Sequence, residues 1–206
     1  MENKHVFLCI SNYFKGSAFL RRLSSLGNTV YLITSEKLRE ADWPHEHIAE
    51  TFYMPGQDLD WNMEHLLLGV ADLMRRSPIH AIVALDDYDV EKATYLREHL
   101  RIPGMGQTTG RYFRDKLAMR MRAHSAGIRV PAFSPLFVDE QINAYIAEVP
   151  GPGYLSRGRR PPPMASLKCI PPSSSGKKFI AWEKTGFATW WKPSAPEMST
   201  MWIACW

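Results

Sequence analysis

Three carboxylates within four residues are the first group of side chains that could do chemistry in this chain of 206 residues. Asp86, Asp87 and Asp89 directly follow the apolar run of residues 81–85. Carboxylates gathered in this way can bind a metal ion or a cationic substrate. Acids also gather at helix starts, where they cap backbone N–H groups and meet the positive end of the helix dipole. The sequence favours this second interpretation, in which Asp87 or Asp89 caps the next helix.

A second group combines one lysine with two glycines. Lys116 stands in the string Arg-Asp-Lys-Leu-Ala-Met, and Gly104 and Gly106 lie in the string Pro-Gly-Met-Gly before it. A lysine ammonium can offset phosphate charge during a transfer reaction. The glycines are typical of a flexible loop beside a substrate, and equally of a plain turn. Taken by itself, Lys116 is best interpreted as one more solvated surface lysine.

Other reactive residue types form no recognisable motif. Residues 11–16, Ser-Asn-Tyr-Phe-Lys-Gly, lack the glycines of a dinucleotide-binding loop. The 7 histidines are scattered and form no H-E-x-x-H pair, so the sequence predicts no metal site. Cys9 lies in an apolar run and is interpreted as a small core residue. Three cysteines without a framework spacing fit a reducing cytosol, which predicts a cytoplasmic protein.

Short apolar runs alternate with amphipathic stretches and must position these residues. Strand–helix–strand repeats of this kind require crossover connections, and they predict an α/β fold with a Rossmann-like parallel sheet and helices on both faces. Ligands of such sheets bind beyond the carboxyl ends of the strands, which places residues 11–16 and Asp86–Asp89 at one site. The predicted strands are residues 6–10, 30–33, 52–54, 81–85 and 132–137, and the predicted helices are residues 16–26, 66–74, a stretch ending near residue 100, 108–126 and 139–147.

The composition changes after Pro152. Residues 1–152 hold 17 Lys and Arg against 19 Asp and Glu, a net charge of −2, whereas the remainder holds 8 against 2, a net charge of +6. The remainder also holds 7 of the 15 prolines, which interrupt helices and strand ladders. The basic excess therefore belongs to an irregular tail and predicts no nucleic-acid partner. No apolar run reaches the ~18 residues of a transmembrane helix, and the start lacks a signal-peptide layout, so no membrane partner is predicted.

Three strings follow one another in residues 1–152: Pro103-Gly104, D-K-x-x-M at Asp115–Met119 and A-G-I-x-V-P at Ala126–Pro131. With these strings in this order, residues 1–152 resemble the ATP-grasp family. It implies a Rossmann-like domain over residues 1–103 and the start of the ATP-binding region over residues 104–152. It also implies ATP and Mg²⁺ as cofactors, with Lys116 reaching the ATP phosphates. An intact relative phosphorylates a small-molecule carboxylate to an acyl phosphate, which an amine or similar nucleophile attacks. The substrate side is assigned to Asp86, Asp87, Gly104 and Gly106, and no catalytic residue is assigned.

The family pattern stops at Pro152. Where the family has G-P-W-V-x-K-P, residues 151–157 read G-P-G-Y-L-S-R, so the strand and its phosphate-binding lysine are missing. One lost base would explain the change, because residues 153–157 can be encoded by codons that read Trp-Val-Leu-Lys-Pro once one T is restored before them. The same frame turns residues 196–206 into a string that contains Gly-Asp-Val-Tyr-His-Val-Asp, which resembles a second family motif.

The sequence therefore predicts a truncated, catalytically inactive ATP-grasp ligase with a frameshifted tail at residues 153–206. Two alternatives stay open. One is a non-catalytic module that binds a small molecule or a protein on its Rossmann-like half. The other is an RNA-binding tail, since Arg157, Arg159 and Arg160 lie in the same segment as several tryptophans.

Overall fold

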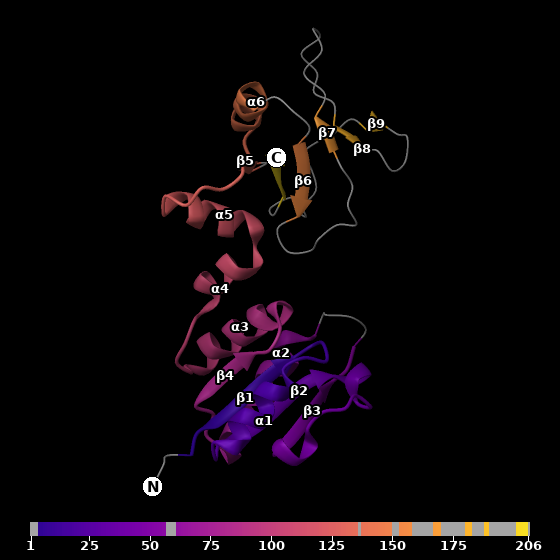
Figure 1. The fold of residues 1–206 in the computed structure, drawn as a ribbon, viewed down its shortest axis with the longest axis vertical. Helices are drawn as coiled ribbons and strands as arrows, with labels where there is room; N and C mark the ends of the chain where they lie inside the picture. The colour runs from indigo at the N-terminus through magenta and orange to yellow at the C-terminus, as the bar shows by residue number, and fades with distance from the viewer. Residues whose placement is uncertain are drawn as a thin grey trace. The chain divides into compact units, whose positions relative to one another are not determined.

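The chain divides into two compact units, Met1–Arg114 and Asp115–Trp206, which are described separately (Figure 1). Both belong to a computed structural model. It describes residues 4–56, 61–135, 137–149, 153–157, 167–169, 180–182, 188–189 and 201–205. Among these residues, none of the helices is both long enough and apolar enough to cross a membrane. The predicted boundary at residue 103 precedes a helix, residues 107–114, that packs within the first unit.

The first unit is built on a parallel sheet of four strands in the order β3-β2-β1-β4. The central strand β1 pairs with β2 on one side, from Val6 opposite Thr29, and with β4 on the other, from Phe7 opposite Ala81. The connections therefore move outward from β1 to β3 and then cross back to β4. The crevice between β1 and β4 is the point where the strand order reverses. The strands are β1 (Val6–Ser11), β2 (Thr29–Ser35), β3 (Glu50–Met54) and β4 (Ala81–Ala84).

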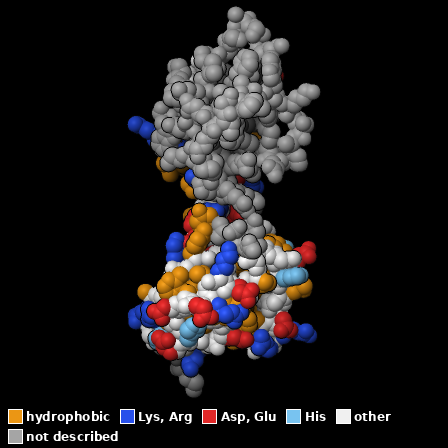
Figure 2. Space-filling model, turned by 90° about the vertical axis from the view of Figure 1, so that its right-hand side faces the viewer, with side chains coloured by type: hydrophobic (Ala, Val, Ile, Leu, Met, Phe, Trp, Pro, Cys, Tyr) orange, Lys and Arg blue, Asp and Glu red, His pale blue; other side chains and the backbone are white. Residues whose placement is uncertain are grey.

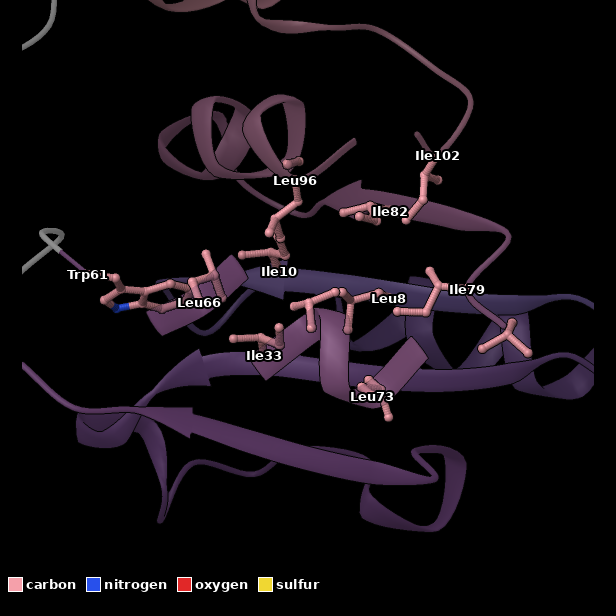
Figure 3. Close-up of a cluster of buried hydrophobic side chains, with 13 residues drawn as sticks. Leu8, Ile10, Ile33, Trp61, Leu66, Leu73, Ile79, Ile82, Leu96 and Ile102 are labelled. Atoms are coloured by element: carbon pink, nitrogen blue, oxygen red, sulfur yellow. The ribbon is translucent and has the colours of Figure 1, made fainter. Parts of the chain in front are cut away.

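Helices cover both faces of this sheet because alternate residues of each strand are apolar on opposite sides. Leu8 and Ile10 of β1 pack in one core with side chains of α2 and α3, which converge in Figure 3. Cys9 faces the other way and packs with Leu20 of α1. The predicted parallel sheet with helices on both faces is thus confirmed. The helices are α1 (Ser17–Ser25), α2 (Met63–Arg76), α3 (Val90–Leu100) and α4 (Gln107–Arg114), with single 3₁₀ turns at Glu36–Leu38, His45–His47 and Asp87–Asp89.

One predicted helix is in fact two. The expected helix of residues 108–126 breaks at Asp115, which separates α4 from α5 (Lys116–Ser125). Asp115 has extended backbone angles, and its Oδ1 accepts hydrogen bonds from the N–H groups of Leu117 (2.9 Å) and Ala118 (3.2 Å). It is the N-cap of α5, so the Asp-Lys pair begins a helix instead of lying inside one. The predicted stop at Gly127 is confirmed by its φ of 75°.

The described residues of the second unit form α5, α6 and six short strands. Leu117 of α5 is buried and packs with Phe133 of β5. β10 pairs antiparallel with both β5 and β6, while β7, β8 and β9 form a second antiparallel sheet. A strand therefore does follow Pro152, contrary to the expectation, although Ser156 holds the position of the family's lysine. Of the predicted irregular tail, residues 158–166, 170–179, 183–187, 190–200 and 206 lie outside those described. The elements are β5 (Phe133–Pro135), α6 (Asp139–Glu148), β6 (Gly153–Arg157), β7 (Leu167–Cys169), β8 (Ile180–Trp182), β9 (Ala188–Thr189) and β10 (Met201–Cys205).

Candidate functional site

Two loops meet at the carboxyl edge of the sheet, where β1 and β4 end. The backbone N–H of Asn12 donates to Oδ2 of Asp89 at 2.8 Å, and the ammonium of Lys15 forms an ion pair with Asp86. The rings of Tyr13 and Tyr88 lie 5.4 Å apart between centroids. The predicted meeting of residues 11–16 with the acidic loop is confirmed. The predicted ligand position of an open parallel sheet is thus lined by acids, lysine and tyrosine.

Asp86 is the buried member of an ion pair with an exposed lysine. Its side chain is 1% exposed, against 58% for Lys15. Its Oδ1 accepts from the N–H of Tyr88 at 2.9 Å. Burial by itself raises the pKa of Asp86, but the hydrogen bonds from Lys15 and from the Tyr88 N–H outweigh it and hold the pKa below its usual value. The carboxyl group is therefore ionised at neutral pH, and the hydrogen bond to it raises the pKa of Lys15.

Asp89 holds the first loop in place instead of capping a helix. It is fully buried and occupies the N-cap position of α3, but its side chain makes no cap hydrogen bond there. It accepts from Asn12 and pairs with Lys92, whose Nζ lies 3.2 Å from Oδ1 and 4.9 Å from the ring centre of Trp61. Burial raises the pKa of Asp89 above its usual range. Asp89 is thus the N-cap residue of α3 by position, as predicted, but the expected side-chain cap hydrogen bond is not formed; the acid whose side chain caps a helical turn is Asp86, at the start of the 3₁₀ turn.

Asp87 pairs with an arginine from a helix that the sequence analysis did not place at this site. Nη1 of Arg114 lies 2.7 Å from Oδ2 of Asp87, and its guanidinium lies 4.4 Å from the ring centre of Tyr88. Arg114 is 13% exposed, whereas Asp87 is 61% exposed. The helix α4 reaches this position because Gly110 lets it pack closely on α3. A Cβ at Gly110 would lie 2.6 Å from Cγ2 of Thr94.

The acidic cluster is therefore balanced by side-chain cations. Asp86 pairs with Lys15, Asp89 with Lys92 and Asp87 with Arg114. In the part of the chain that the structure describes, His, Cys, Asp and Glu form no group of three able to hold a metal ion. A charged group of a ligand at this edge of the sheet would meet ammonium, guanidinium and carboxylate side chains.

Gly104 and Gly106 lie away from this edge. They belong to the turn after α3, which is held by Arg97: its Nε donates to the carbonyl of Ile82 in β4 (3.0 Å) and its Nη1 to that of Met105 (3.2 Å). Gly104 has a φ of 134°, and a Cβ there would lie 3.0 Å from Cδ of Arg97. These contacts are typical of a plain turn. Arg97 lies near the end of α3, whereas the acids lie before its start, so the structure separates the glycines from Asp86 and Asp87.

Lys116 belongs to the second unit and is exposed on the first turn of α5. The N-terminus of a helix carries partial positive charge, which adds to that of the ammonium. Asp115 beside it is buried and occupied by the cap. Lys116 is therefore an exposed cation at a helix N-terminus.

Solved structures of other proteins share this fold. An L-amino acid ligase from Bacillus licheniformis matches with a TM-score of 0.59 at 16% identity, over 82% of this chain and 40% of the ligase. A second match is the biotin carboxylase domain of a Hydrogenobacter thermophilus 2-oxoglutarate carboxylase, in complex with MgADP and bicarbonate. Its TM-score is 0.56 at 18% identity, and the match covers 75% of this chain and 35% of that domain's chain. The N5-carboxyaminoimidazole ribonucleotide synthetase from Thermus thermophilus matches with a TM-score of 0.54 at 14% identity, over 96% of this chain and 46% of the synthetase. No sequence-family model matches the chain, and no curated protein is similar to it in sequence.

These likenesses establish the fold. The chain shares the fold of these three proteins over the parts that it covers, and this is the α/β fold that the resemblance implied. It spans less than half of the length of each of these three structures.

The sequence did not single out Lys15 or Arg114 as site residues. For Lys15 a signal was present, since a cation directly after a buried strand and before glycine lies at the ligand edge of a parallel sheet.

Proposed function

We propose that the chain is the first part of an ATP-grasp ligase that acts on a small-molecule carboxylate. One observation carries the proposal. On a chain with the fold of ATP-grasp ligases, the D-K-x-x-M string begins α5 at its cap, and the A-G-I-x-V-P string starts where α5 ends. The carboxylate binds at the carboxyl edge of β1 and β4, beside Lys15, Asp86 and Asp87, because ligands of open parallel sheets bind at such an edge.

Lys116 contacts the ATP phosphates in this proposal. Its exposed ammonium on the first turn of α5 supports the role, because developing phosphate charge is stabilised by fixed cations. The residues that the structure describes do not complete a site for ATP and Mg²⁺. Ser156 holds the position of the family's second lysine, and no described group of three acids, histidines or cysteines could hold the metal. The chain as it stands is therefore proposed to be inactive, and no transfer step is derived from it.

A lost base before the codon of Gly153 explains why the family pattern ends there. Sequencing the gene through the codons of residues 150–154 tests this directly. Reinserting one base should give Trp-Val-Leu-Lys-Pro over residues 153–157 and continue past residue 206. The restored protein should bind MgATP, and Lys116→Ala should weaken that binding about tenfold or more, because one charge-assisted phosphate contact is lost. An early stop codon in the restored frame, or a restored protein that does not bind MgATP, would refute the ligase assignment.

A second candidate function is a binding module without catalysis. It is favoured by one observation: all charged side chains of the crevice belong to Met1–Arg114, so they need nothing from the second unit. The visible face of the described residues carries interspersed acidic and basic side chains (Figure 2), which fits a small-molecule ligand better than a nucleic acid. Ligand binding by the chain together with failure of the restored protein to bind MgATP would select this function.

A further inference from the structure

The two ion pairs at the open side of the crevice are oriented in opposite senses. In the first pair the cation is exposed, with Lys15 at 58% and Asp86 at 1%. In the second pair the anion is exposed, with Asp87 at 61% and Arg114 at 13%. The buried member of each pair fixes the exposed member in place. The crevice therefore presents one ammonium and one carboxylate to a ligand.

The exposed ammonium stands beside a helix start that has no side-chain cap. Gly16 is the N-cap of α1, has a φ of 83° and offers no side chain to the first N–H groups, and the first turn of α1 contains no acid. Gly16 is required there because a Cβ would lie 2.8 Å from Cδ1 of Leu85. Lys15 and the positive end of α1 together favour an anionic group such as a carboxylate.

Two aromatic rings lie next to the cations of these two ion pairs. Tyr13 lies against Tyr88, with Nζ of Lys15 5.8 Å from the first ring centre and the guanidinium of Arg114 4.4 Å from the second. Tyrosine faces attract cations and pack against apolar side chains. A ligand ammonium near Asp87 would therefore meet both a carboxylate and aromatic faces.

The four charges of Lys15, Asp86, Asp87 and Arg114 cancel. A ligand with only a carboxylate adds a negative charge next to two aspartates, and a ligand with only an ammonium adds a positive charge next to Lys15 and Arg114. A ligand that carries both groups meets an opposite charge at each end. We propose that the crevice binds a zwitterionic α-amino acid, with Lys15 binding its carboxylate and Asp87 its ammonium. This inference rests on the proposed function and narrows its carboxylate substrate to amino acids.

Three probes that share a phenyl ring test the inference by calorimetry on the full chain. L-Phenylalanine carries both charges, 3-phenylpropanoate lacks the ammonium, and 2-phenylethylamine lacks the carboxylate. L-Phenylalanine should bind about tenfold more tightly than either analogue, because each analogue loses one charge-assisted contact. Asp87→Asn should abolish the preference over 3-phenylpropanoate. Lys15→Gln should abolish the preference over 2-phenylethylamine, and Lys15→Arg should retain it.

Two variants that change an exposed charge outside the crevice serve as matched controls. Arg21→Gln on α1 and Asp72→Asn on α2 should leave all three affinities unchanged. Equal binding of L-phenylalanine and 3-phenylpropanoate would overturn the amino-acid inference and leave the carboxylate site standing. Binding of none of the probes would overturn the inference together with the carboxylate site. Because Asp87 is exposed, its variant should fold even if Lys15→Gln, which leaves Asp86 buried without its partner, does not.

Discussion

Two helical glycines should respond in opposite ways to the same substitution. Gly→Ala inside a helix ordinarily stabilises a protein by about 0.8–1 kcal/mol. Gly69 lies in α2 with nothing within 4 Å of an added Cβ, so Gly69→Ala should show this gain. Gly110 lies in α4, where an added Cβ would lie 2.6 Å from Cγ2 and 3.1 Å from Oγ1 of Thr94. Overpacking of this kind costs about 1–3 kcal/mol. Gly110→Ala should therefore lose up to about 2 kcal/mol net, since the overpacking offsets the helix gain.

The measurement is native-state amide exchange of the central strand β1, which reports the free energy of unfolding of the first unit by itself. Thr94→Ser provides the second half of the test. It removes Cγ2 and keeps a hydroxyl, which in Thr94 donates to the carbonyl of Glu91 at 3.0 Å. In the Gly110→Ala background, Thr94→Ser should restore at least about 1 kcal/mol. If Gly110→Ala stabilises the first unit as much as Gly69→Ala does, the close packing of α3 on α4 is refuted.

Three further predictions concern the cap, the buried thiol and the acidic loop. Asp115→Ala should lower the free energy of unfolding of the second unit by about 1 kcal/mol, because two capping hydrogen bonds are lost. Amide exchange of α5 measures this change, and an unchanged value would contradict the break between α4 and α5. Burial raises the pKa of the Cys9 thiol to about 12. In a chain carrying Cys169→Ser and Cys205→Ser, alkylation of Cys9 at pH 8 should therefore be about 10³-fold slower than alkylation of an exposed thiol. Fast labelling of the folded chain would exclude a buried Cys9. The pKa of Asp86 is lower in the folded state than its unfolded value of 3.8. Its contribution to the free energy of unfolding is therefore complete above pH 3.8 and is lost as the pH falls through the folded-state pKa. Asp86→Asn should therefore destabilise the first unit at pH 6 and matter less at pH 3, and a difference independent of pH would refute the ion pair with Lys15.

Local patterns allowed the first unit to be predicted well. Continuous apolar runs as short as residues 6–10 favour strands buried on both faces, and crossover rules then order them into a parallel sheet. The same rules bring residues 11–16 to Asp86 without any knowledge of side-chain contacts. These features depend on periodicity within a few residues and on chain handedness, both of which can be inferred from one sequence.

Features that depend on long-range packing could not be predicted. The pairing of Arg114 with Asp87 joins residues on different helices and follows from the close approach of α4 to α3 at Gly110. The break at Asp115 was missed because the helix-forming residues on either side give no sign of where one helix ends. The role of Asp89 was missed because a buried acid at a helix start can bind another loop as well as its own helix.

The ligase assignment can be tested by trapping the acyl phosphate that such an enzyme forms. The frame-restored protein would be incubated with MgATP, L-phenylalanine and hydroxylamine, which converts an acyl phosphate to a hydroxamate and releases phosphate. Hydroxamate and ADP should form together, both should require the amino acid, and Lys116→Ala should lower their rate by about tenfold or more. Asp72→Asn should leave the rate unchanged. Formation of no hydroxamate by a restored protein that is folded and binds MgATP would contradict activation of an amino acid, and failure to bind MgATP as well would contradict the claim that this chain is the first part of an ATP-grasp ligase.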